Sequence, residues 1–233
     1  MSSNATHGKE DGCVNSNEIV KAYNLETVLK SPEAVTELYL HNRGFRAIPT
    51  EVFRLKALKK LGLSENILTT IPCEINQMKE LPEVDFSHNN LTALPLEILD
   101  LPNLKSLNLG HNLFDGFPEI VFSSKNLTEL LIAGNSFCQI PSQIGKLRKL
   151  EALDLSGLNL KKNPRSIDML SCLRRLNLSH NALSKLPQTI GLCTELEELL
   201  VLDNKLLQLP ESVGSLKKLS KMVFKKNRLK CLP

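Results

Sequence analysis

Residues 173–187 read LRRLNLSHNALSKLP, and the rest of the chain follows the pattern of this stretch. Leu173, Leu176 and Leu178 are followed by Asn181 and Leu183, which gives the spacing L-x-x-L-x-L-x-x-N-x-L. The same spacing returns 23 residues earlier and 23 residues later, without an insertion or a deletion. Nine copies begin at Val35, Leu58, Leu81, Leu104, Leu127, Leu150, Leu173, Leu196 and Leu219.

This pattern is the signature of the leucine-rich repeat, in which each copy forms one turn of a solenoid. The leucines of L-x-L alternate with outward residues, as in a short strand with one buried face. Strands of successive copies would pair in parallel, about 4.8 Å apart. Because the return segment is thicker than a strand, the stack must curve. We expect an α/β fold: a right-handed solenoid arc with a parallel sheet on its concave face and short helical turns on its convex face.

Proline occupies one slot in all nine copies, and an apolar residue follows it three positions later in eight of them. The fixed φ and missing N–H of proline suit the first residue of a helical turn, where we expect it. The spacing of three turns the apolar residues toward the core. The prolines are Pro49, Pro72, Pro95, Pro118, Pro141, Pro164, Pro187, Pro210 and Pro233, and the apolar residues are Val52, Ile75, Ile98, Val121, Ile144, Ile167, Ile190 and Val213.

Asparagine recurs where each strand turns away from the sheet, and an amide there can satisfy buried backbone groups of neighbouring copies. The column consists of Asn66, Asn89, Asn112, Asn135, Asn181, Asn204 and Asn227. Arg43 replaces the first asparagine. In copy six Leu158 takes the slot and Asn163 precedes Pro164. Either Asn159 compensates for this change, or the chain bends or bulges between residues 155 and 164 and reshapes the arc.

Three segments follow from the pattern. Residues 1–16 are polar and predict a disordered tail. Residues 17–34 predict a helix and a linker, with Asn17 as N-cap and the helix ending near Lys30 before Pro32. That helix would cover the open core of the first copy or, alternatively, dock on a partner. Residues 35–233 form the repeat domain, whose ninth copy is incomplete.

The composition favours a protein of a reducing compartment and does not indicate nucleic-acid binding. The formal charge of +4 is small and dispersed. The N-terminus lacks the apolar region of a signal peptide, and no apolar run approaches the roughly 18 residues of a membrane span. The six cysteines form no C-x-x-C pair. We expect a cytoplasmic protein without a transmembrane segment, and a membrane-peripheral or nuclear location stays open.

The sequence offers no set of residues that would form a catalytic site. His41, His88, His111 and His180 fall at outward positions of the strand segments, and His88 and His111 share a column in adjacent copies. A metal site would need further ligands. The cysteines other than Cys13 fall at or beside core positions, which predicts inert hydrophobic side chains. We expect no catalytic residue, no metal and no cofactor.

The third and fifth residues of each copy point out from the concave face. Their mixed charges around small side chains favour a protein partner. Leu200, Leu202 and Val223 form an apolar cluster with a charged rim, which is typical of an interaction site unless further sequence covers it. The candidate partner-binding residues are Glu83, Asp85, Glu129, Leu131, Arg175, Asn177, Glu198, Leu200, Leu202, Lys221 and Val223.

The ninth copy ends before its helical half. Its strand would be a sheet edge, and Leu219, Met222, Phe224 and Leu229 would lack a neighbour. We expect either a truncated product or an uncapped C-terminal end that frays or self-associates weakly. Seven basic residues between positions 217 and 230 form a solvated end or a contact for an acidic partner or anionic lipid surface.

The L-P-x-x-I-x-x-L ending of the copies, as in LPQTIGLC (186–193) and LPESVGSLKKL (209–219), resembles the intracellular leucine-rich repeat class. It is similar to the repeat domains of the Ras–Raf scaffold group and of the Scribble, Erbin and Densin group. The resemblance covers residues 35–233 and implies a non-catalytic scaffold in intracellular signalling, which binds a small GTPase or a phosphatase on its concave face. The alternative is a recognition or accessory subunit of an enzyme complex such as a phosphatase or ubiquitin ligase.

Overall fold

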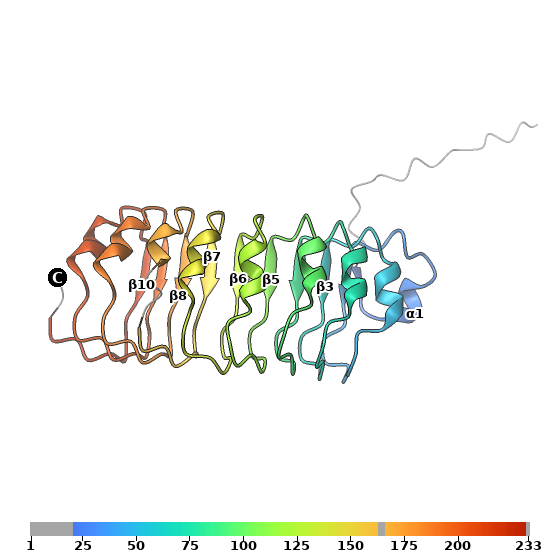
Figure 1. Cartoon of the computed structure of the whole chain (residues 1–233), viewed down its shortest axis with the longest axis horizontal. Coiled ribbons are helices and arrows are strands. Elements are labelled where there is room, and N and C mark those ends of the chain that lie inside the picture. The colour runs from blue at the N-terminus through green and yellow to red at the C-terminus, as the bar shows by residue number, and fades with distance from the viewer. Residues whose placement is uncertain (1–20, 163–165, 232–233) are drawn as a thin grey trace, which may run out of the picture.

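The computed structural model describes residues 21–162 and 166–231 as an elongated stack with the sheet on one side and short helices on the other (Figure 1). The described strands form one parallel sheet in chain order. They are β1 (Lys21–Ala22), β2 (Glu37–Tyr39), β3 (Lys60–Gly62), β4 (Glu83–Asp85), β5 (Ser106–Asn108), β6 (Glu129–Leu131), β7 (Ala152–Asp154), β8 (Arg175–Asn177), β9 (Glu198–Leu200) and β10 (Lys221–Val223).

A 3₁₀ helix follows each strand from β2 to β9, and a four-residue helix, α1 (Leu25–Val28), precedes β2. The 3₁₀ helices are η1 (Thr50–Arg54), η2 (Cys73–Gln77), η3 (Leu96–Asp100), η4 (Glu119–Ser123), η5 (Ser142–Lys146), η6 (Ile167–Met169), η7 (Gln188–Leu192) and η8 (Glu211–Ser215). The expected leucine-rich repeat solenoid is therefore confirmed, with helical turns of the 3₁₀ type.

The strand register follows the 23-residue period without a slip from β2 to β10. Glu37 lies opposite Lys60, which lies opposite Glu83, and the same offset continues to Lys221. The middle residue of each strand points inward. Leu38, for example, is fully buried. Because no copy gains or loses a residue, outward side chains of equal position form straight rows along the sheet.

The core is one continuous cluster that reaches from Ala22 to Leu216 and consists mainly of leucine. The apolar residues placed three positions after the prolines are buried in it in the seven copies up to Ile190, and Val213 is partly buried. Burying a leucine or isoleucine side chain contributes about 1.5–3 kcal/mol. The stack is held together mainly by these side chains, since each strand is only three residues long.

The prolines stand one residue earlier than the sequence analysis predicted. Pro72 is the N-cap of η2, with ψ of 159°, and its carbonyl accepts the first hydrogen bond from the N–H of Ile75 at 3.2 Å. The ring fixes φ near the helical value, but the extended ψ keeps the residue outside the helix. The same geometry recurs at Pro141 and Pro187, while Pro164 and Pro233 lie outside the described residues.

The asparagine column forms a ladder between copies, as expected. The Asn112 Nδ2 donates to the carbonyls of Leu109 and Gly110 in its own copy and of Phe86 in the preceding one. Its Oδ1 accepts from the N–H of Leu91 at 3.0 Å. One buried amide therefore satisfies backbone groups of two copies. We call the seven residues from Asn66 to Asn227 the asparagine ladder.

Two copies without this asparagine share a different turn. A residue with positive φ precedes the asparagine slot in every copy, and in the first and sixth copies a second one follows it, at Gly44 (φ 66°) and Asn159 (φ 54°). Glycine and asparagine are the residue types that best tolerate this conformation. Asn159 thus adopts the altered turn but does not replace the missing amide. The N–H of Phe137, which the missing amide would have bound, has no acceptor in the part of the chain that the structure describes.

The segment before the first copy differs from the expected long helix in its described part. Lys21–Ala22 is a strand that pairs in parallel with Glu37–Leu38, and only Leu25–Val28 is helical. The strand wins because it extends the sheet and covers the backbone edge of β2, which a helix would leave open. Residues 1–20, which hold the predicted tail and the start of the predicted helix, lie outside the described residues.

The last copy is less buried than its neighbours. Leu196, Leu199, Val201 and Leu206 of copy eight are fully buried. Their counterparts one period later are only partly buried: Leu219, Met222, Phe224 and Leu229. The apolar interior of the solenoid is therefore partly open at β10.

Candidate partner-binding site

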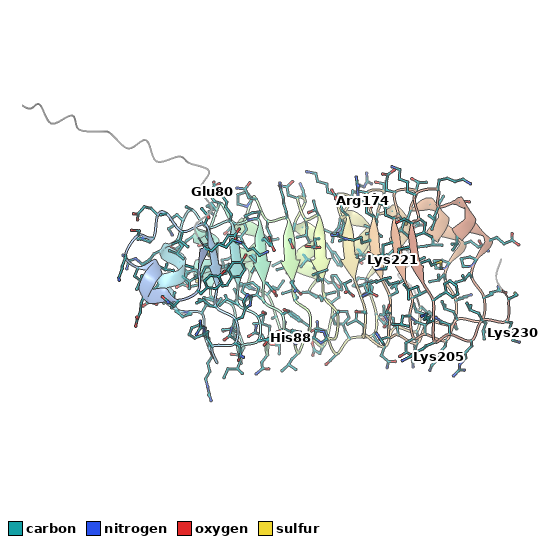
Figure 2. The ribbon with its side chains drawn as sticks, turned by 180° about the vertical axis from the view of Figure 1, so that it is seen from behind. Glu80, His88, Arg174, Lys205, Lys221 and Lys230 are labelled. Carbon is teal, nitrogen blue, oxygen red and sulfur yellow. The ribbon has the colours of Figure 1, made fainter. Side chains whose placement is uncertain are left out.

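The sheet face, seen from the front in Figure 2, carries two rows of outward side chains, because equivalent residues of successive strands lie opposite each other. The first row holds the first residue of each strand from β2 to β10: Glu37, Lys60, Glu83, Ser106, Glu129, Ala152, Arg175, Glu198 and Lys221. The second row holds the third residue: Tyr39, Gly62, Asp85, Asn108, Leu131, Asp154, Asn177, Leu200 and Val223.

A shallow hollow of about 170 Å³ lies over β6 to β9. Its lining includes six of the predicted partner-binding residues: Glu129, Leu131, Arg175, Asn177, Glu198 and Leu200. Ala152 and Asp154 also line it and were missed as site residues, although both stand in the two rows. Lys221 and Val223 lie next to it on β10, and Leu202 follows β9. Glu83 and Asp85 lie on β4, away from the hollow.

An ion pair crosses one side of the hollow. The Arg175 Nη2 donates to the Glu129 Oε1 at 3.2 Å, although the two residues are two strands apart. Ala152 stands between them, and its small side chain is almost fully buried, so the arginine can lie across it. Ser106 donates from its Oγ to the other Glu129 oxygen at 2.7 Å. Glu129 is thus held by two neighbours.

Neutral groups surround Asp154 on the other side of the hollow. Its Oδ2 accepts from the Asn177 Nδ2 at 3.0 Å, and its Oδ1 accepts from the N–H of Ser156 at 2.8 Å. No ion pair is found for Asp154 among the described residues. Glu198, in contrast, is paired with Lys221. Asp154 is therefore a half-exposed carboxylate whose charge no cation neutralises.

Leucines stand at the two ends of the second row within the hollow. Leu131 and Leu200 are half-buried and are separated by Asp154 and Asn177. Leu200, Leu202 and Val223, which were predicted to form an apolar cluster, are each half-buried. The hollow thus combines apolar ends with a charged centre, and it offers a partner both apolar and charged contacts.

Residues 172–193 match the family model described as Leucine Rich Repeat. The protein is a leucine-rich repeat solenoid. Comparison with curated protein sequences finds no match. Among solved structures, this solenoid is similar to a leucine-rich repeat protein of Leptospira interrogans, with 28% identity and a TM-score of 0.77 over 92% of this chain and 60% of that one.

Two receptor kinases of Arabidopsis are also similar to the solenoid. The ectodomain of GASSHO1/SCHENGEN3 is 30% identical, with a TM-score of 0.72 over 89% of this chain and 26% of that one. HAESA is 31% identical, with a TM-score of 0.70 over 83% of this chain and 34% of that one. The solenoid therefore spans less than two thirds of each of these relatives. They are a bacterial protein and plant receptor kinases, and the finer resemblance to intracellular scaffolds is not found among them.

An aromatic cluster at the other end of the sheet face was missed by the sequence analysis. The rings of Tyr23 and Tyr39 stack at 5.7 Å, and the His41 ring lies 5.6 Å from Tyr39. Gly62 makes room beside them, because a Cβ there would lie 2.5 Å from the His41 ring. Tyr23 falls within residues 17–34, for which the sequence predicted a helix and a linker. In the structure it follows the short strand Lys21–Ala22, which pairs with β2, and its ring stacks on Tyr39.

Hydrogen bonding and burial perturb two acidic groups in this cluster. The Tyr39 hydroxyl donates to the Glu37 Oε2 at 2.7 Å, which lowers the pKa of that carboxyl, and Lys21 at 3.4 Å adds to the effect. Burial, together with the neighbouring carboxylate, raises the pKa of Tyr39 to about 12. The pair is therefore a neutral phenol beside a carboxylate over the whole neutral range.

The histidines lie past the strands, which corrects their predicted position. His88, His111 and His180 occupy the turn with positive φ that follows each strand, and Figure 2 shows His88 along one edge of the sheet. The rings of His88 and His111 stack at 4.3 Å, as their shared column predicted. In the described residues, no group of three or more His, Cys, Asp or Glu side chains is placed to hold a metal ion.

The cysteines also differ from expectation. Only Cys193 of the described ones is buried, whereas Cys73, Cys138, Cys172 and Cys231 are exposed and free. These cysteines lie beside prolines or near the boundaries between copies, and those positions are more exposed than the sequence pattern predicted. Burial raises the pKa of the Cys193 thiol to about 11.

None of the described helices is long and apolar enough to cross a bilayer.

Proposed function

We propose that this solenoid is a non-catalytic protein-binding module that holds its partner on the sheet face. The observation that carries the proposal is the hollow over β6 to β9, where leucines flank a charged centre. Leucine-rich repeat domains are generally protein- or peptide-binding modules. The sheet face combines this hollow with rows of charged and apolar side chains that cross several strands, which are features of a binding site.

The similar structures support a protein or peptide partner. HAESA was solved with a peptide hormone and a co-receptor, and GASSHO1/SCHENGEN3 was solved with CASPARIAN STRIP INTEGRITY FACTOR 2. Straight rows of outward side chains, made by unbroken 23-residue copies, suit an extended segment that crosses several strands. Each such segment would contact one outward residue from each strand in turn.

For the setting, we propose the cytoplasm and a scaffold role in signalling, with a small GTPase or a phosphatase as partner. Four exposed free cysteines support a reducing compartment, because exposed thiols pair or oxidise outside it. The L-P-x-x-I-x-x-L ending supports the intracellular class. An accessory subunit of a phosphatase or ubiquitin ligase is the second candidate, and the same free cysteines favour it equally.

Affinity purification with matched surface variants tests the proposal. Leu131→Lys places a positive charge in the hollow, and we expect it to abolish capture of partners that the wild-type chain retains. Leu96→Lys is the control, because Leu96 is 75% exposed on η3, on the opposite side of the stack. Mass spectrometry would identify a GTPase, phosphatase or ligase. Loss of capture with Leu96→Lys alone would refute a site on the sheet face.

We also propose that the open end at β10 associates weakly with a second copy of the chain. Met222 and Phe224 are only partly buried there, and apolar interior without cover favours association. Lys221, Lys225 and Lys226 oppose close approach, so the affinity should be low and should rise with salt. Light scattering over a concentration series measures it, and a strict monomer in high salt would contradict the idea.

A further inference from the structure

The charges around the hollow do not cancel within the hollow. Its lining carries three carboxylates, on Glu129, Asp154 and Glu198, and one guanidinium, on Arg175. Arg175 forms an ion pair with Glu129 at 3.2 Å, and Lys221 on the neighbouring strand forms one with Glu198. Asp154 keeps only neutral neighbours, the amide of Asn177 and the N–H of Ser156. The remaining charge of the hollow is therefore negative and centred on Asp154.

The volume of the hollow suits one long side chain. It is about 170 Å³. A cavity of about 150 Å³ holds a benzene-sized molecule, so this space is large enough for one side chain and too small for a helix or strand. Leu131 and Leu200 stand three strands apart, roughly 14 Å at the usual strand spacing, and form apolar ends.

We propose that the hollow takes a lysine or arginine side chain of an extended partner segment. The cationic head binds the Asp154 carboxylate, the aliphatic stem packs on Leu131 or Leu200, and an apolar residue next to it on the partner packs on the other leucine. This rests on the proposed function, because it assumes that the sheet face binds the partner. The inference adds that the sheet face selects a partner residue with a positive charge.

An acidic partner residue fits the same place less well. It would have to displace Glu129 from Arg175 and would then lie among three carboxylates. A neutral residue would leave the Asp154 charge without a partner when contact removes its water, which is costly. Charge complementarity therefore favours a basic residue at this position.

A displayed library of random peptides, selected on the full chain, tests the inference without a known partner. We expect binders to share one lysine or arginine with an apolar residue close to it. For individual binders, replacing that residue by norleucine or citrulline should weaken binding by about tenfold or more, because a hydrogen-bonded charge pair is lost.

Three variants of the protein locate the cation. Asp154→Asn should weaken the selected peptides by about tenfold or more. Asp115→Asn is the control for loss of a carboxylate, because Asp115 is exposed and lies outside the hollow and outside both rows, and it should change affinity less than about twofold. The swap Asp154→Asn with Asn177→Asp keeps the net charge and the hydrogen bond between these side chains. The affinity of this double variant for the selected peptides should still fall several-fold, because the carboxylate moves by one strand, about 4.8 Å.

Leu131→Lys separates the two proposals, because it removes an apolar contact and places a like charge beside the proposed cation position. Peptides that depend on Leu131 but show no basic residue, or that bind Asp154→Asn or the swap as well as wild type, overturn the inference and leave the sheet-face function standing. Peptides that bind Leu131→Lys unchanged overturn the sheet-face function, and the inference with it. Melting curves of all variants check that each one is folded.

Discussion

Replacing Asn112 by leucine probes the asparagine ladder at a position where the structure isolates one backbone group. The Asn112 amide makes four hydrogen bonds, but three of its acceptors have a second donor. Phe86 also accepts from Asn89, Leu109 also accepts from Asn135, and the carbonyl of Gly110 also accepts from a backbone N–H. The N–H of Leu91, which is fully buried, loses its partner at 3.0 Å and has no replacement.

The expected cost follows from this inventory. An unsatisfied buried donor costs about 1–3 kcal/mol, and the weakened bonds of the carbonyls add about 1 kcal/mol. The free energy of unfolding should therefore fall by about 2–4 kcal/mol. The control is Asn103→Leu, because Asn103 is exposed and donates once, to the carbonyl of Lys79 at 3.0 Å. A surface change of this kind should cost less than about 1 kcal/mol.

Urea unfolding measures both variants, and hydrogen exchange gives the local reading. In Asn112→Leu the amide proton of Leu91 should exchange faster by a larger factor than amides in copies seven and eight, which are distant from the change. If Asn112→Leu lowers the free energy of unfolding no more than Asn103→Leu, or if the Leu91 amide keeps its protection, the asparagine ladder does not contribute to the coupling between copies.

Three further predictions concern the core, a thiol and a carboxyl. Leu176 is fully buried, so Leu176→Ala should cost about 2–5 kcal/mol in urea unfolding. Met222→Ala, at the same position of the partly open last copy, should cost clearly less, and equal costs would contradict an open end. The Cys193 thiol is buried and has a pKa of about 11, so it should react with a thiol reagent at pH 8 only after unfolding, whereas the exposed cysteines should react at once. Fast labelling of Cys193, detected by mass spectrometry, would refute its burial. The pKa of Glu37 is lowered, above all by the hydroxyl of Tyr39, so its stabilisation is present above the ordinary value of 4.5 and is lost as pH falls through the lower folded value. Tyr39→Phe should therefore be less stable than wild type at pH 6, with a difference that shrinks below about pH 4.5, and a pH-independent difference would exclude this cause.

The period of 23 residues determines most of what could be predicted. It fixes which residue faces Leu176 in the next strand, so the sheet, its register and the buried leucines follow from the sequence. The same arithmetic placed Glu129, Leu131 and Arg175 on one face. Periodicity describes neighbours in a regular stack, and it is reliable wherever the stack is regular.

Features that depend on how side chains reach across strands were not predictable in this way. The pairing of Arg175 with Glu129 needs the small Ala152 between them, and the residual charge of Asp154 appears only after that pairing is known. The strand that contains Lys21 was missed because its neighbours favour a helix locally. Pairing with β2 decides its conformation, and that is a tertiary effect.

The altered turn of copy six has a consequence for how the array comes apart. A solenoid behaves as a row of units coupled to their nearest neighbours, and its cooperativity depends on the weakest coupling. The coupling between copies five and six lacks its amide, since Leu158 leaves the N–H of Phe137 unbound within the described residues. Unfolding should begin to divide the array there, into blocks of five and four copies. The hollow bridges the same boundary, with Glu129 on one block and Arg175 on the other. A segment bound in it would act as a clamp between the two blocks and make them melt as one.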